Sequence, residues 1–494
     1  MDPLSYDLDR ARGALALGPA VAWPVVTGRF GSRGGDRQGY TLQGGGNPLW
    51  LHGASVGESG GNLSILASLR ELGYQGPALL SAATPGGLDF LESSLAKAGT
   101  DKPGGQPSPK NRTYPGLYSP TQLAAAPLDF LGAPGRFLDR VAPRALLVLE
   151  TEIWPELFYQ CSLRSIPVLL LSARISQRSL ERFGRAKSFM RQAMAIPSLV
   201  ATISQADQSR LAELGVEPEK SVVIGSPKFD SLIGQARATL ASLPQKTQSE
   251  LSGRDHWDSQ ATSLASAISL MAAPASGPNP LILAGSTHPG EEELIMEAVM
   301  ALPAPGASLA IAPRHLVRIP EVSRLVESFT LKPSPYSETG TLRPGPGSVT
   351  IVDTMGNLSG LYRECDLAIV GGSFFNGDGH NPLEPAAFGK PIVFGQSMSS
   401  FKGPAEKLES IGAATVAPRA FLATAIASLL ASPEKASRAG LAGLWLLSRQ
   451  RPVAPILAQG ILEFLSEPAP QGSQKAMAYL RSQALVQGGP GLYP

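Results

Sequence analysis

Three features that mark special classes of protein are absent from this sequence or nearly so. Only two cysteines occur in 494 residues, Cys161 and Cys365, and no CxxC pair is present. This argues against a disulfide framework or a structural zinc site and fits a reducing compartment. The net charge is only +2, too small to indicate nucleic acid as a partner. No stretch reaches the roughly 20 apolar residues that a membrane-spanning helix needs.

The uncharged stretch at residues 13–28 comes nearest to such a helix and leaves two interpretations open. It carries Trp23 between Pro19 and Pro24 and has arginines on both sides. A segment of this kind can lie in a membrane interface, and it can equally be an N-terminal helix packed on its own domain. It lacks the small-residue cleavage pattern of a secretory leader, so we predict no signal peptide.

What the sequence does contain is typical of a folded chain with two domains. Hydrophobic residues make up 43% and charged residues 17%, the balance of a globular protein. A length of 494 residues exceeds what one hydrophobic core usually holds. The 53 glycines and 44 prolines indicate many tight turns and some long loops.

Apolar runs alternate with helical patterns along both halves of the chain. The runs that predict strands are residues 49–51, 145–150, 166–172, 198–204, 221–226, 280–286, 307–313, 348–353 and 366–373. Amphipathic segments that predict helices are residues 180–195, 205–215 and 291–302. Continuous apolar strands that alternate with helices indicate parallel sheets covered on both faces. We therefore predict an α/β fold with two Rossmann-like domains.

Composition sets the expected boundaries of these domains. The first domain is expected at residues 1–229 and the second at residues 280–465. A Ser- and Pro-rich linker at residues 230–279 separates them, and residues 466–494 form a tail. A polar insert at residues 99–116 and the stretch 237–279 are expected to be surface loops without chemistry.

Acidic and basic side chains follow the predicted strands of the first half. Ligands of open α/β sheets bind at the carboxyl ends of the strands, so residues just after each strand are candidates. These candidates are Ser55, Glu58, Glu150, Glu152, Arg174 and Lys228. Acids and bases of this kind suit proton transfer. Trp154, at a similar position, is expected only to pack.

The corresponding positions of the second half predict an anion site. Gly371, Gly372 and Ser373 are expected to leave backbone N–H groups unoccupied, and "NPLEPAAFG" then starts a helix whose N-terminus suits a phosphate. Arg314 adds a charge-assisted contact to that phosphate. Glu384 is expected to accept hydrogen bonds from ribose hydroxyls. Other candidates at strand ends are Ser286, His288, His315 and His380.

A nucleotide on one domain and an acceptor on the other, facing a cleft, is the arrangement of a nucleotide-sugar transferase. His52 is a fourth histidine at a predicted strand end. The acidic run 291–293 is expected to be an ordinary charged helix start. The single D-x-D, Asp7 to Asp9, lies far from any strand, and no HxxxH pair exists. We therefore predict no required metal, with Arg314, Lys228 and helix dipoles supporting the leaving phosphate.

Eight motifs make the sequence similar to a known family. They are "SVGE", "ETEIWPEL", "SARISQRS", "GSPKFD", "AGSTHPGEEE", "PRH", "DTMGNL" and "GGSFFNGDGHNPLEP". In this order they resemble the Kdo transferases, two-domain glycosyltransferases of the GT-B type. The resemblance implies transfer of 3-deoxy-D-manno-octulosonic acid (Kdo) from CMP-Kdo to the lipid A precursor lipid IVA, in lipopolysaccharide assembly. It also implies a place at the cytoplasmic face of the inner membrane, with no cofactor and no nucleic acid.

The resemblance further implies a role for each matching residue. Glu58 matches the general base of an inverting reaction at a glucosamine hydroxyl, and Glu150 and Lys228 match residues that support the transition state. The matching contacts to CMP are Pro313, Arg314, Met355, Gly356, Asn357, Asn381, Pro382, Leu383 and Glu384. Departures from the family pattern are Asn357 where Glu is usual, Asp378 where Gly is usual, and "SARIS" at residues 172–176 where "NARLS" is usual. The spanning helix with which the family tends to start is not matched either.

Local chemistry around Glu58 fits a general base. Gly57 is expected to allow a turn, and a helix starting at about Ser59 puts Glu58 near an N-terminus that favours its ionised form. The alternative for Glu58 is a plain helix-capping acid.

The alternatives for the whole protein are a GT-B transferase or epimerase that uses a UDP-sugar, and a non-catalytic nucleotide- or lipid-binding protein on the same fold. The sequence leaves open the number of Kdo units and the oligomeric state.

Overall fold

The computed structural model describes residues 46–100, 121–129, 132–150, 152–184, 187–252, 257, 279–303, 306–375, 377–468 and 470–485. The expected interface segment at 13–28 and most of the two inserts lie outside these residues. Within the described part, no helix combines the length and the apolar character needed to cross a membrane. The chain forms two compact units: the described residues up to Asp230 together with those from Pro452 on, and residues Ser231 to Arg451.

The first unit is built on a seven-stranded parallel sheet in the order β3-β2-β1-β4-β5-β6-β7. Its strands are β1 (Leu49–Gly53), β2 (Ala78–Ala82), β3 (Thr121–Ala125), β4 (Ala145–Leu149), β5 (Val168–Ala173), β6 (Leu199–Thr202) and β7 (Ser221–Val223). Its helices include α2 (Val56–Glu71), α3 (Pro85–Thr100), α4 (Ala133–Val141), α5 (Pro155–Leu163), α6 (Gln177–Gly184), α7 (Lys187–Ala195) and α8 (Gln205–Glu213).

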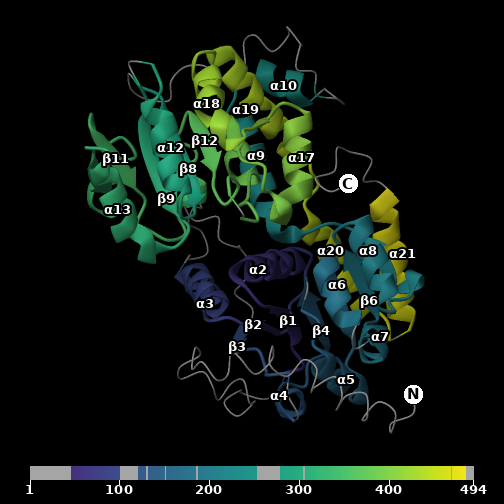
Figure 1. Ribbon diagram of the computed structural model, residues 1–494. Helices are drawn as coiled ribbons and strands as arrows, with labels where there is room; N and C mark the ends of the chain where they lie inside the picture. The colour runs from purple at the N-terminus through teal and green to yellow at the C-terminus, as the bar shows by residue number, and fades with distance from the viewer. Residues whose placement is uncertain are drawn as a thin grey trace. The chain divides into compact units, whose positions relative to one another are not determined.

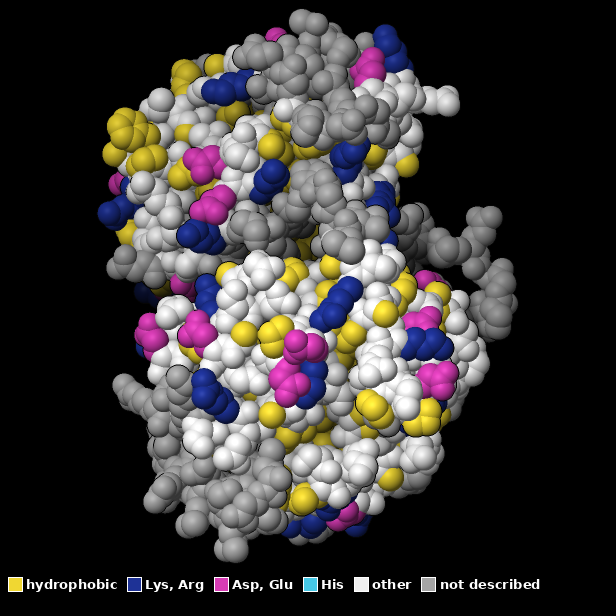
Figure 2. All heavy atoms as spheres, turned by 90° about the vertical axis from the view of Figure 1, so that its right-hand side faces the viewer, with side chains coloured by type: hydrophobic (Ala, Val, Ile, Leu, Met, Phe, Trp, Pro, Cys, Tyr) yellow, Lys and Arg dark blue, Asp and Glu magenta, His cyan; other side chains and the backbone are white. Residues whose placement is uncertain are grey.

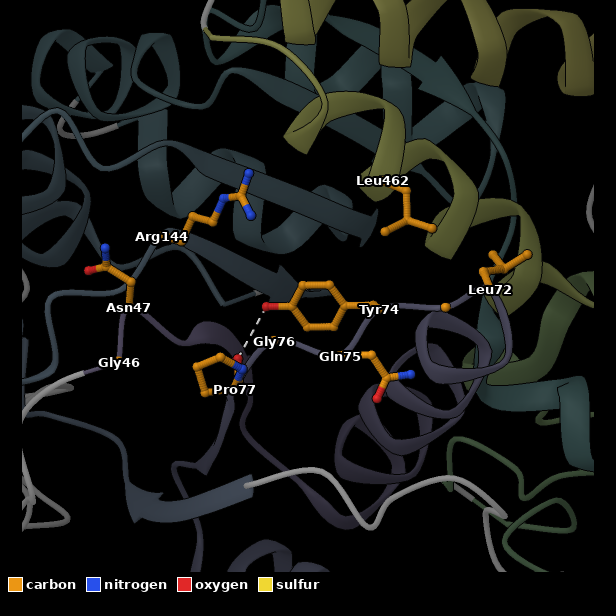
Figure 3. Close-up of a pocket in the computed structure, with 10 residues that line it drawn as sticks. Gly46, Asn47, Leu72, Tyr74, Gln75, Gly76, Pro77, Arg144 and Leu462 are labelled. Carbon is orange, nitrogen blue, oxygen red and sulfur yellow. Dashed lines mark hydrogen bonds between the residues drawn. The ribbon is translucent and has the colours of Figure 1, made fainter.

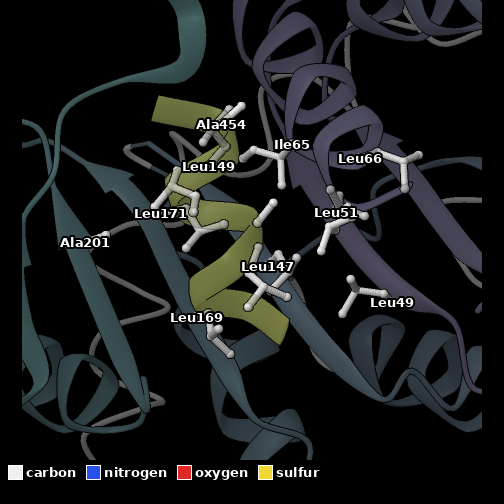
Figure 4. Close-up of a cluster of buried hydrophobic side chains, with 14 of the residues drawn as sticks. Leu49, Leu51, Ile65, Leu66, Leu147, Leu149, Leu169, Leu171, Ala201 and Ala454 are labelled. Atoms are coloured by element: carbon white, nitrogen blue, oxygen red, sulfur yellow. The ribbon is translucent and has the colours of Figure 1, made fainter. Parts of the chain in front are cut away.

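Both faces of this sheet are covered, which explains its continuous apolar strands. Alternate residues of a strand point to opposite faces. Leu147 and Leu149 of β4 join the core beneath α2, where they meet Ile65 (Figure 4). Leu146 and Val148 belong to the core on the other face. There Trp50 stacks on Phe137 of α4 at 4.6 Å between ring centroids. A strand buried on both faces needs an apolar residue at nearly every position.

The C-terminal helices correct the expected boundary at residue 465. Helix α20 (Val453–Leu465) and helix α21 (Gln471–Leu485) belong to the first unit and cover the same face of its sheet as α2 (Figure 1). The reason is apolar burial, because Ile456 and Ile461 of α20 enter the core around Leu149. The start of α20 is fixed by Asp230, whose carboxylate accepts hydrogen bonds from the N–H groups of Val453 at 2.8 Å and Ala454 at 2.6 Å.

The expected linker at 230–279 begins as ordered helix. Helices α9 (Asp230–Ala241) and α10 (Gln245–Ser252) occupy its first part. Thr239 of α9 donates to the carbonyl of Ala387 at 2.9 Å, and Arg237 donates to the carbonyls of Ser448 and Gln450. These bonds make α9 part of the second unit instead of a loose connection.

The second unit repeats the architecture with a seven-stranded parallel sheet in the order β10-β11-β9-β8-β12-β13-β14. Its strands are β8 (Leu281–Thr287), β9 (Ser308–Pro313), β10 (Lys332–Pro335), β11 (Ser348–Ile351), β12 (Leu367–Val370), β13 (Ile392–Phe394) and β14 (Ala414–Val416). Its helices include α12 (Glu291–Met300), α13 (Ile319–Ser328), α14 (Tyr336–Thr339), α15 (Leu358–Leu361), α16 (Leu383–Ala386), α17 (Lys402–Ser410), α18 (Leu422–Leu430) and α19 (Pro433–Ser448). Two parallel, doubly covered sheets confirm the predicted α/β class.

The described residues on the face drawn in Figure 2 carry charges of both signs without a dominant area of either. On the face drawn in Figure 2, Lys and Arg side chains are interspersed with Asp and Glu side chains. This pattern agrees with the net charge of +2. On this face no basic stripe of the kind that tracks a nucleic-acid backbone is present.

The strand order of each sheet defines a topological switch point, where successive connections leave in opposite directions. In the first unit this point lies between β1 and β4, and in the second it lies between β8 and β12. Ligands of open α/β sheets bind at the carboxyl ends of the strands beside such a point. The loops after these four strands are therefore the places to look for chemistry.

Replacing Asp230 by Ala tests whether the cap on α20 anchors the C-terminal helices. Two backbone N–H groups lose their acceptor, so we expect a cost of about 1–2 kcal/mol and a thermal midpoint lower by roughly 2–8 °C. The control is Asp139→Ala, which removes an exposed ion pair with Arg164 and is expected to change the midpoint little. Equal midpoints for the two variants would contradict the anchoring role of Asp230.

Candidate functional site

An ammonium group lies between two carboxylates at the switch point of the first unit. Lys228 Nζ is 2.8 Å from Glu150 Oε2 and 3.5 Å from Glu58 Oε1. Glu58 comes from the first turn of α2, directly after β1, and Glu150 directly follows β4. Lys228 lies in the short 3₁₀ helix η3 (Pro227–Phe229) after β7. Three residues far apart in sequence thus form one contact set, which we call the Glu58–Lys228–Glu150 cluster.

Glu58 acts as a helix cap as well as a partner of Lys228. Its Oε2 accepts hydrogen bonds from the backbone N–H groups of Ala54 at 2.5 Å and Ser55 at 2.8 Å. Its Oε1 is the oxygen turned toward Lys228. The helix begins at Val56 and not at the expected Ser59, so Glu58 lies inside the first turn. The capping role and a catalytic role use different oxygens, and neither interpretation excludes the other.

Gly57 is needed for space rather than for a turn. It is the second residue of α2 and is not among the residues with a left-handed backbone. A Cβ added at Gly57 would lie 3.2 Å from Lys228 Cε and 3.5 Å from Lys228 Nζ. The missing side chain therefore lets the lysine lie across the start of the helix and reach both carboxylates. This corrects the expected reason for a glycine at this position.

Glu150 is buried and held in an unfavourable backbone conformation. Its side chain is 5% exposed and its φ of 64° lies in the left-handed region. Such a conformation costs about 1–3 kcal/mol for a residue other than glycine and is found at functional sites. Burial raises the pKa of Glu150 above its ordinary value, although the nearby Lys228 acts in the opposite direction. Lys228 thus compensates the charge of a carboxylate that water does not solvate.

Glu152 belongs to a neighbouring buried network. Its Oε2 accepts a hydrogen bond from Trp154 Nε1 at 2.6 Å and lies 3.9 Å from His52 Nε2. Burial acts to raise the pKa of Glu152, but contacts with His52 and Trp154 outweigh it and the pKa lies below its usual range. His52 is fully buried within β1, so the expectation of a strand-end loop position is wrong. This network adjoins the cluster, because the charge of Lys228 also acts on Glu152.

The remaining first-unit candidates lie close by. Ser55 supplies one of the N–H groups that cap Glu58. Arg174 follows β5, and its charge acts on the titration of Glu150. Trp154 packs against the apolar core, as expected, in addition to its bond to Glu152.

In the second unit, the expected free glycine turn is already filled by a carboxylate. Glu291 Oε1 accepts from the N–H groups of Ser373 at 2.9 Å and Phe374 at 3.0 Å. Its Oε2 accepts from the N–H groups of Gly372 at 2.7 Å and His288 at 2.9 Å. Gly371 donates to the carbonyl of Gly285. The prediction that Gly371, Gly372 and Ser373 offer unoccupied N–H groups to phosphate is therefore wrong.

The interpretation of residues 291–293 changes with this finding. Glu291 and Glu292 are each 1% exposed. Glu292 accepts from Thr287 Oγ1 at 2.7 Å and forms an ion pair with Arg318 at 2.6 Å. Only Glu293 lies exposed, as a plain charged helix start would. The sequence signal for this is the run of three successive acids directly after Gly290, because one helix start does not need three acids.

Helix α16 gives little support to phosphate binding at a helix N-terminus. It spans only Leu383–Ala386, a single turn. A helix dipole grows from aligned peptide units, and one turn supplies few of them. Asn381 Oδ1 accepts from the N–H of Leu383 at 3.1 Å, so one of the donors at this turn is also used within the loop. The expected phosphate site on this helix stays a prediction.

Three histidines gather beside this filled turn. His288 Nε2 lies 2.8 Å from His380 Nε2, and the ring centroids of His288 and His315 are 6.1 Å apart. Burial, together with the nearby His288, Arg314 and His315, lowers the pKa of His380 to about 4. Among the residues the structure describes, no group of His, Cys, Asp or Glu is arranged to hold a metal ion. The absence of a metal requirement stays a prediction.

The predicted contacts to the nucleotide follow neighbouring strands. The order β11-β9-β8-β12 brings their loops to one edge of the sheet. The residues there are Met355, Gly356 and Asn357 after β11, Pro313 and Arg314 at the end of β9, and Asn381, Pro382, Leu383 and Glu384 after β12. Ser286 is inside β8, with a left-handed φ of 57° at a register shift. Met355 is 69% exposed.

Glu384 is the most strongly perturbed acid at this edge. Burial raises its pKa to about 7, while Asn381 and Arg314 oppose the shift. A carboxyl group that titrates near neutrality can accept or donate a hydrogen bond, and a ribose hydroxyl can take either role. Asn357, where the family pattern has an acid, donates to Thr354 Oγ1 at 3.3 Å.

A pocket elsewhere in the first unit is not part of this site. Its volume is about 640 Å³, and it is lined by residues that include Asn47, Tyr74, Arg144 and Leu462 (Figure 3). Tyr74 donates its hydroxyl to the carbonyl of Pro77 at 3.2 Å. Asn47, Pro77 and Arg144 precede β1, β2 and β4, so the pocket lies at the amino ends of the strands. The Glu58–Lys228–Glu150 cluster lies at the opposite edge.

A family model and several curated relatives carry the same name. A family model described as "3-Deoxy-D-manno-octulosonic-acid transferase (kdotransferase)" matches residues 28–231. A 3-deoxy-D-manno-octulosonic acid transferase of Haemophilus influenzae is 33% identical over 66% of this chain and 70% of that protein. The transferase of the same name from Bordetella pertussis is 31% identical over 78% of this chain and 80% of that protein.

Solved structures show the fold. Anabaena Alr3699/HepE in complex with UDP and glucose matches with a TM-score of 0.50 and 14% identity, over 85% of this chain and 99% of that one. The C-terminal CMP-Kdo binding domain of WaaA from Acinetobacter baumannii is 23% identical over 38% of this chain and 100% of that one, with a TM-score of 0.33.

Replacing Glu291 by Gln tests whether this carboxylate holds the glycine turn. Gln presents an NH₂ group to two backbone N–H donors, so we expect the turn to loosen. Amide hydrogen exchange over residues 371–375 should become at least roughly tenfold faster, the effect of losing a buried charge-assisted acceptor. Glu293→Gln, on the same helix turn but exposed, serves as the control. Unchanged exchange in Glu291→Gln would show that the turn holds itself.

Proposed function

Because this chain belongs to the 3-deoxy-D-manno-octulosonic acid transferase family, we propose that it transfers Kdo from CMP-Kdo to a glucosamine hydroxyl of lipid IVA, the lipid A precursor. Membership rests on relatives at 33% and 31% identity that it matches over 70% and 80% of their lengths. The family is one of glycosyltransferases. The donor, the acceptor and the inverting course are the proposed part.

The observation that carries the proposal is the position of Lys228 between Glu58 and Glu150. All three residues meet at the switch point of a parallel sheet, where ligands of such folds bind. The ammonium group of Lys228 compensates the charge of both carboxylates, of which Glu150 is buried and Glu58 lies near a helix N-terminus. Such a pair suits a reaction that moves a proton from one partner to the other. The family match covers all three residues.

In the proposed reaction, Glu58 takes the proton of the attacking hydroxyl. Its Oε2 is engaged by the N–H groups of Ala54 and Ser55, so Oε1 is the oxygen that receives the proton. Those two N–H donors and the helix dipole favour the ionised form that a base must start from. The hydroxyl oxygen then bonds to the anomeric carbon of Kdo as the bond to CMP breaks on the opposite face.

Glu150 and Lys228 support the charges that develop. Two roles are open to Glu150 on chemical grounds: stabilising positive charge on the sugar, or orienting Lys228. The 2.8 Å contact to Lys228 favours the second role, with the ammonium group then available to the carboxylate of Kdo. We propose no divalent metal in this scheme, with Arg314 among the groups that support the leaving phosphate.

The acceptor places the protein at a membrane surface. Lipid IVA is an amphiphile, so transfer to it takes place at the cytoplasmic face of the inner membrane in this proposal. Attachment would be peripheral or through the segment at residues 13–28, which carries Trp23 and flanking arginines.

The experiment that tests the proposal is a transfer assay with both substrates. The protein is given CMP-Kdo, generated in place because this donor is labile, together with tetraacylated lipid A precursor. We expect a product heavier by one or more Kdo units and equimolar release of CMP. CMP binding without transfer would reject the acceptor. Binding of UDP but not CMP would favour a UDP-sugar enzyme on the same fold.

Replacing Glu58 by Gln tests the general base within this assay. Gln retains an oxygen for the N–H groups of Ala54 and Ser55, so the helix start is kept while the base is lost. We expect transfer to slow by roughly 10²- to 10⁴-fold with CMP binding nearly unchanged. Glu71→Gln, at the exposed end of the same helix, is the matched control. Activity within a few-fold of the unmodified protein would reject the base role.

A further inference from the structure

The three histidines of the second unit occupy the positions where an anion is expected. His288, His315 and His380 follow β8, β9 and β12, which are adjacent in the sheet and include both strands of its switch point. We call them the histidine cluster. All three side chains are at least partly accessible, and Arg314 directly precedes His315.

The contact between His288 and His380 limits the protons that this pair can hold. A distance of 2.8 Å between two Nε2 atoms requires one N–H donor and one unprotonated acceptor. A second proton between the same two atoms would place two N–H groups head to head. The pair therefore shares one proton as long as the contact stands.

The groups that face His380 from the neighbouring loops make its electrostatic surroundings positive. His288 faces His380 from the loop after β8, and Arg314 and His315 face it from the loop after β9. The nearby acids are engaged elsewhere: Glu291 accepts four backbone N–H groups, and Asp378 Oδ1 accepts from Ser399 at 2.7 Å. Glu384 lies within range of Arg314, and burial raises its pKa and favours its neutral form.

Because Glu291 already occupies the backbone N–H groups of the glycine turn, we expect an incoming anion to contact these imidazoles instead. The backbone donors of Gly372, Ser373 and Phe374 are bound to Glu291 and cannot serve a phosphate. Gly372 has a left-handed φ of 69°, and a Cβ on it would lie 2.9 Å from His380 Cδ2. The imidazole of His380 is thus packed against the very turn that would otherwise bind the anion.

We propose that His288, His315 and His380 form, together with Arg314, the binding subsite for the phosphate of the nucleotide donor, and that the His288–His380 pair takes up one proton from solvent when the phosphate binds. The N–H···N contact is replaced by two N–H groups that donate to phosphate oxygens, and the added proton comes from water. The inference rests on the proposed function for its donor, a cytidine monophosphate ester.

The sign of the pH effect follows from linkage. A bound phosphate favours the charged imidazoles, so their pKa values are higher in the complex than in the free protein. Affinity is therefore greater at low pH and is lost as the pH rises through the values of the complex. CMP itself is dianionic above its second phosphate pKa of about 6, so uptake measured above that pH comes from the protein.

Calorimetric titration with CMP in two buffers of different ionisation enthalpy tests the proposal. The unmodified protein is expected to take up protons on binding CMP just above the phosphate pKa, and His380→Gln is expected to take up fewer. His380→Gln and His288→Gln should each weaken CMP binding by roughly tenfold. Affinity for cytidine, which lacks the phosphate, should not change. Arg324→Gln removes an exposed cation of the same unit and should alter nothing.

The other possible outcomes overturn either the subsite or the identity of the donor. Equal CMP affinity and equal proton uptake in the unmodified protein and the variants would overturn the subsite. Parallel loss of CMP and cytidine affinity would also overturn it, because it would show a structural role. His315→Asn, which alters an exposed ring, decides the matter if His380→Gln does not fold. Binding of UDP in place of CMP would overturn the donor alone, and the same variants titrated with UDP would then test the subsite.

Discussion

The contact of the Lys228 ammonium with Glu150 and Glu58 is the interaction on which the rest of the site depends. Glu150 is buried and strained in its backbone, and burial raises its pKa while the neighbouring Lys228 acts to lower it. Lys228 supplies its ammonium group from the short 3₁₀ helix after the edge strand β7, and the missing side chain of Gly57 gives it room. The same ammonium group faces Glu58, so three loops are held together by charge at the edge where substrates of this fold bind.

The second unit solves a related problem in a different way. Its switch point also contains a buried carboxylate, but Glu291 is neutralised by four backbone N–H groups and not by a cation. In the proposed account, a ligand anion is therefore held by side chains that can gain charge and not by the backbone N–H groups of this turn. The two units thus share an architecture and differ in how the buried carboxylate at the switch point is compensated.

Residue patterns predicted the parts of this picture that depend on local sequence. The apolar runs at 145–150 and 280–286 became β4 and β8 because strands buried on both faces must be apolar throughout. Strand β10, with the sequence Lys-Pro-Ser-Pro at the sheet edge, had no such pattern. The return of α20 to the first unit and the filling of the glycine turn by Glu291 were missed, since both depend on contacts between residues more than 80 positions apart.

The pH dependence of transfer by Lys228→Met tests the central claim most directly. Without the ammonium group, the two carboxylates face each other with no cation between them, and the pair retains a proton to higher pH. The account predicts that the acidic limb of kcat/KM moves upward by about one pH unit or more, in addition to a lower plateau. A lower plateau with the acidic limb unmoved would contradict it, because Lys228 would then act on the substrate without holding the carboxylates in their ionised form.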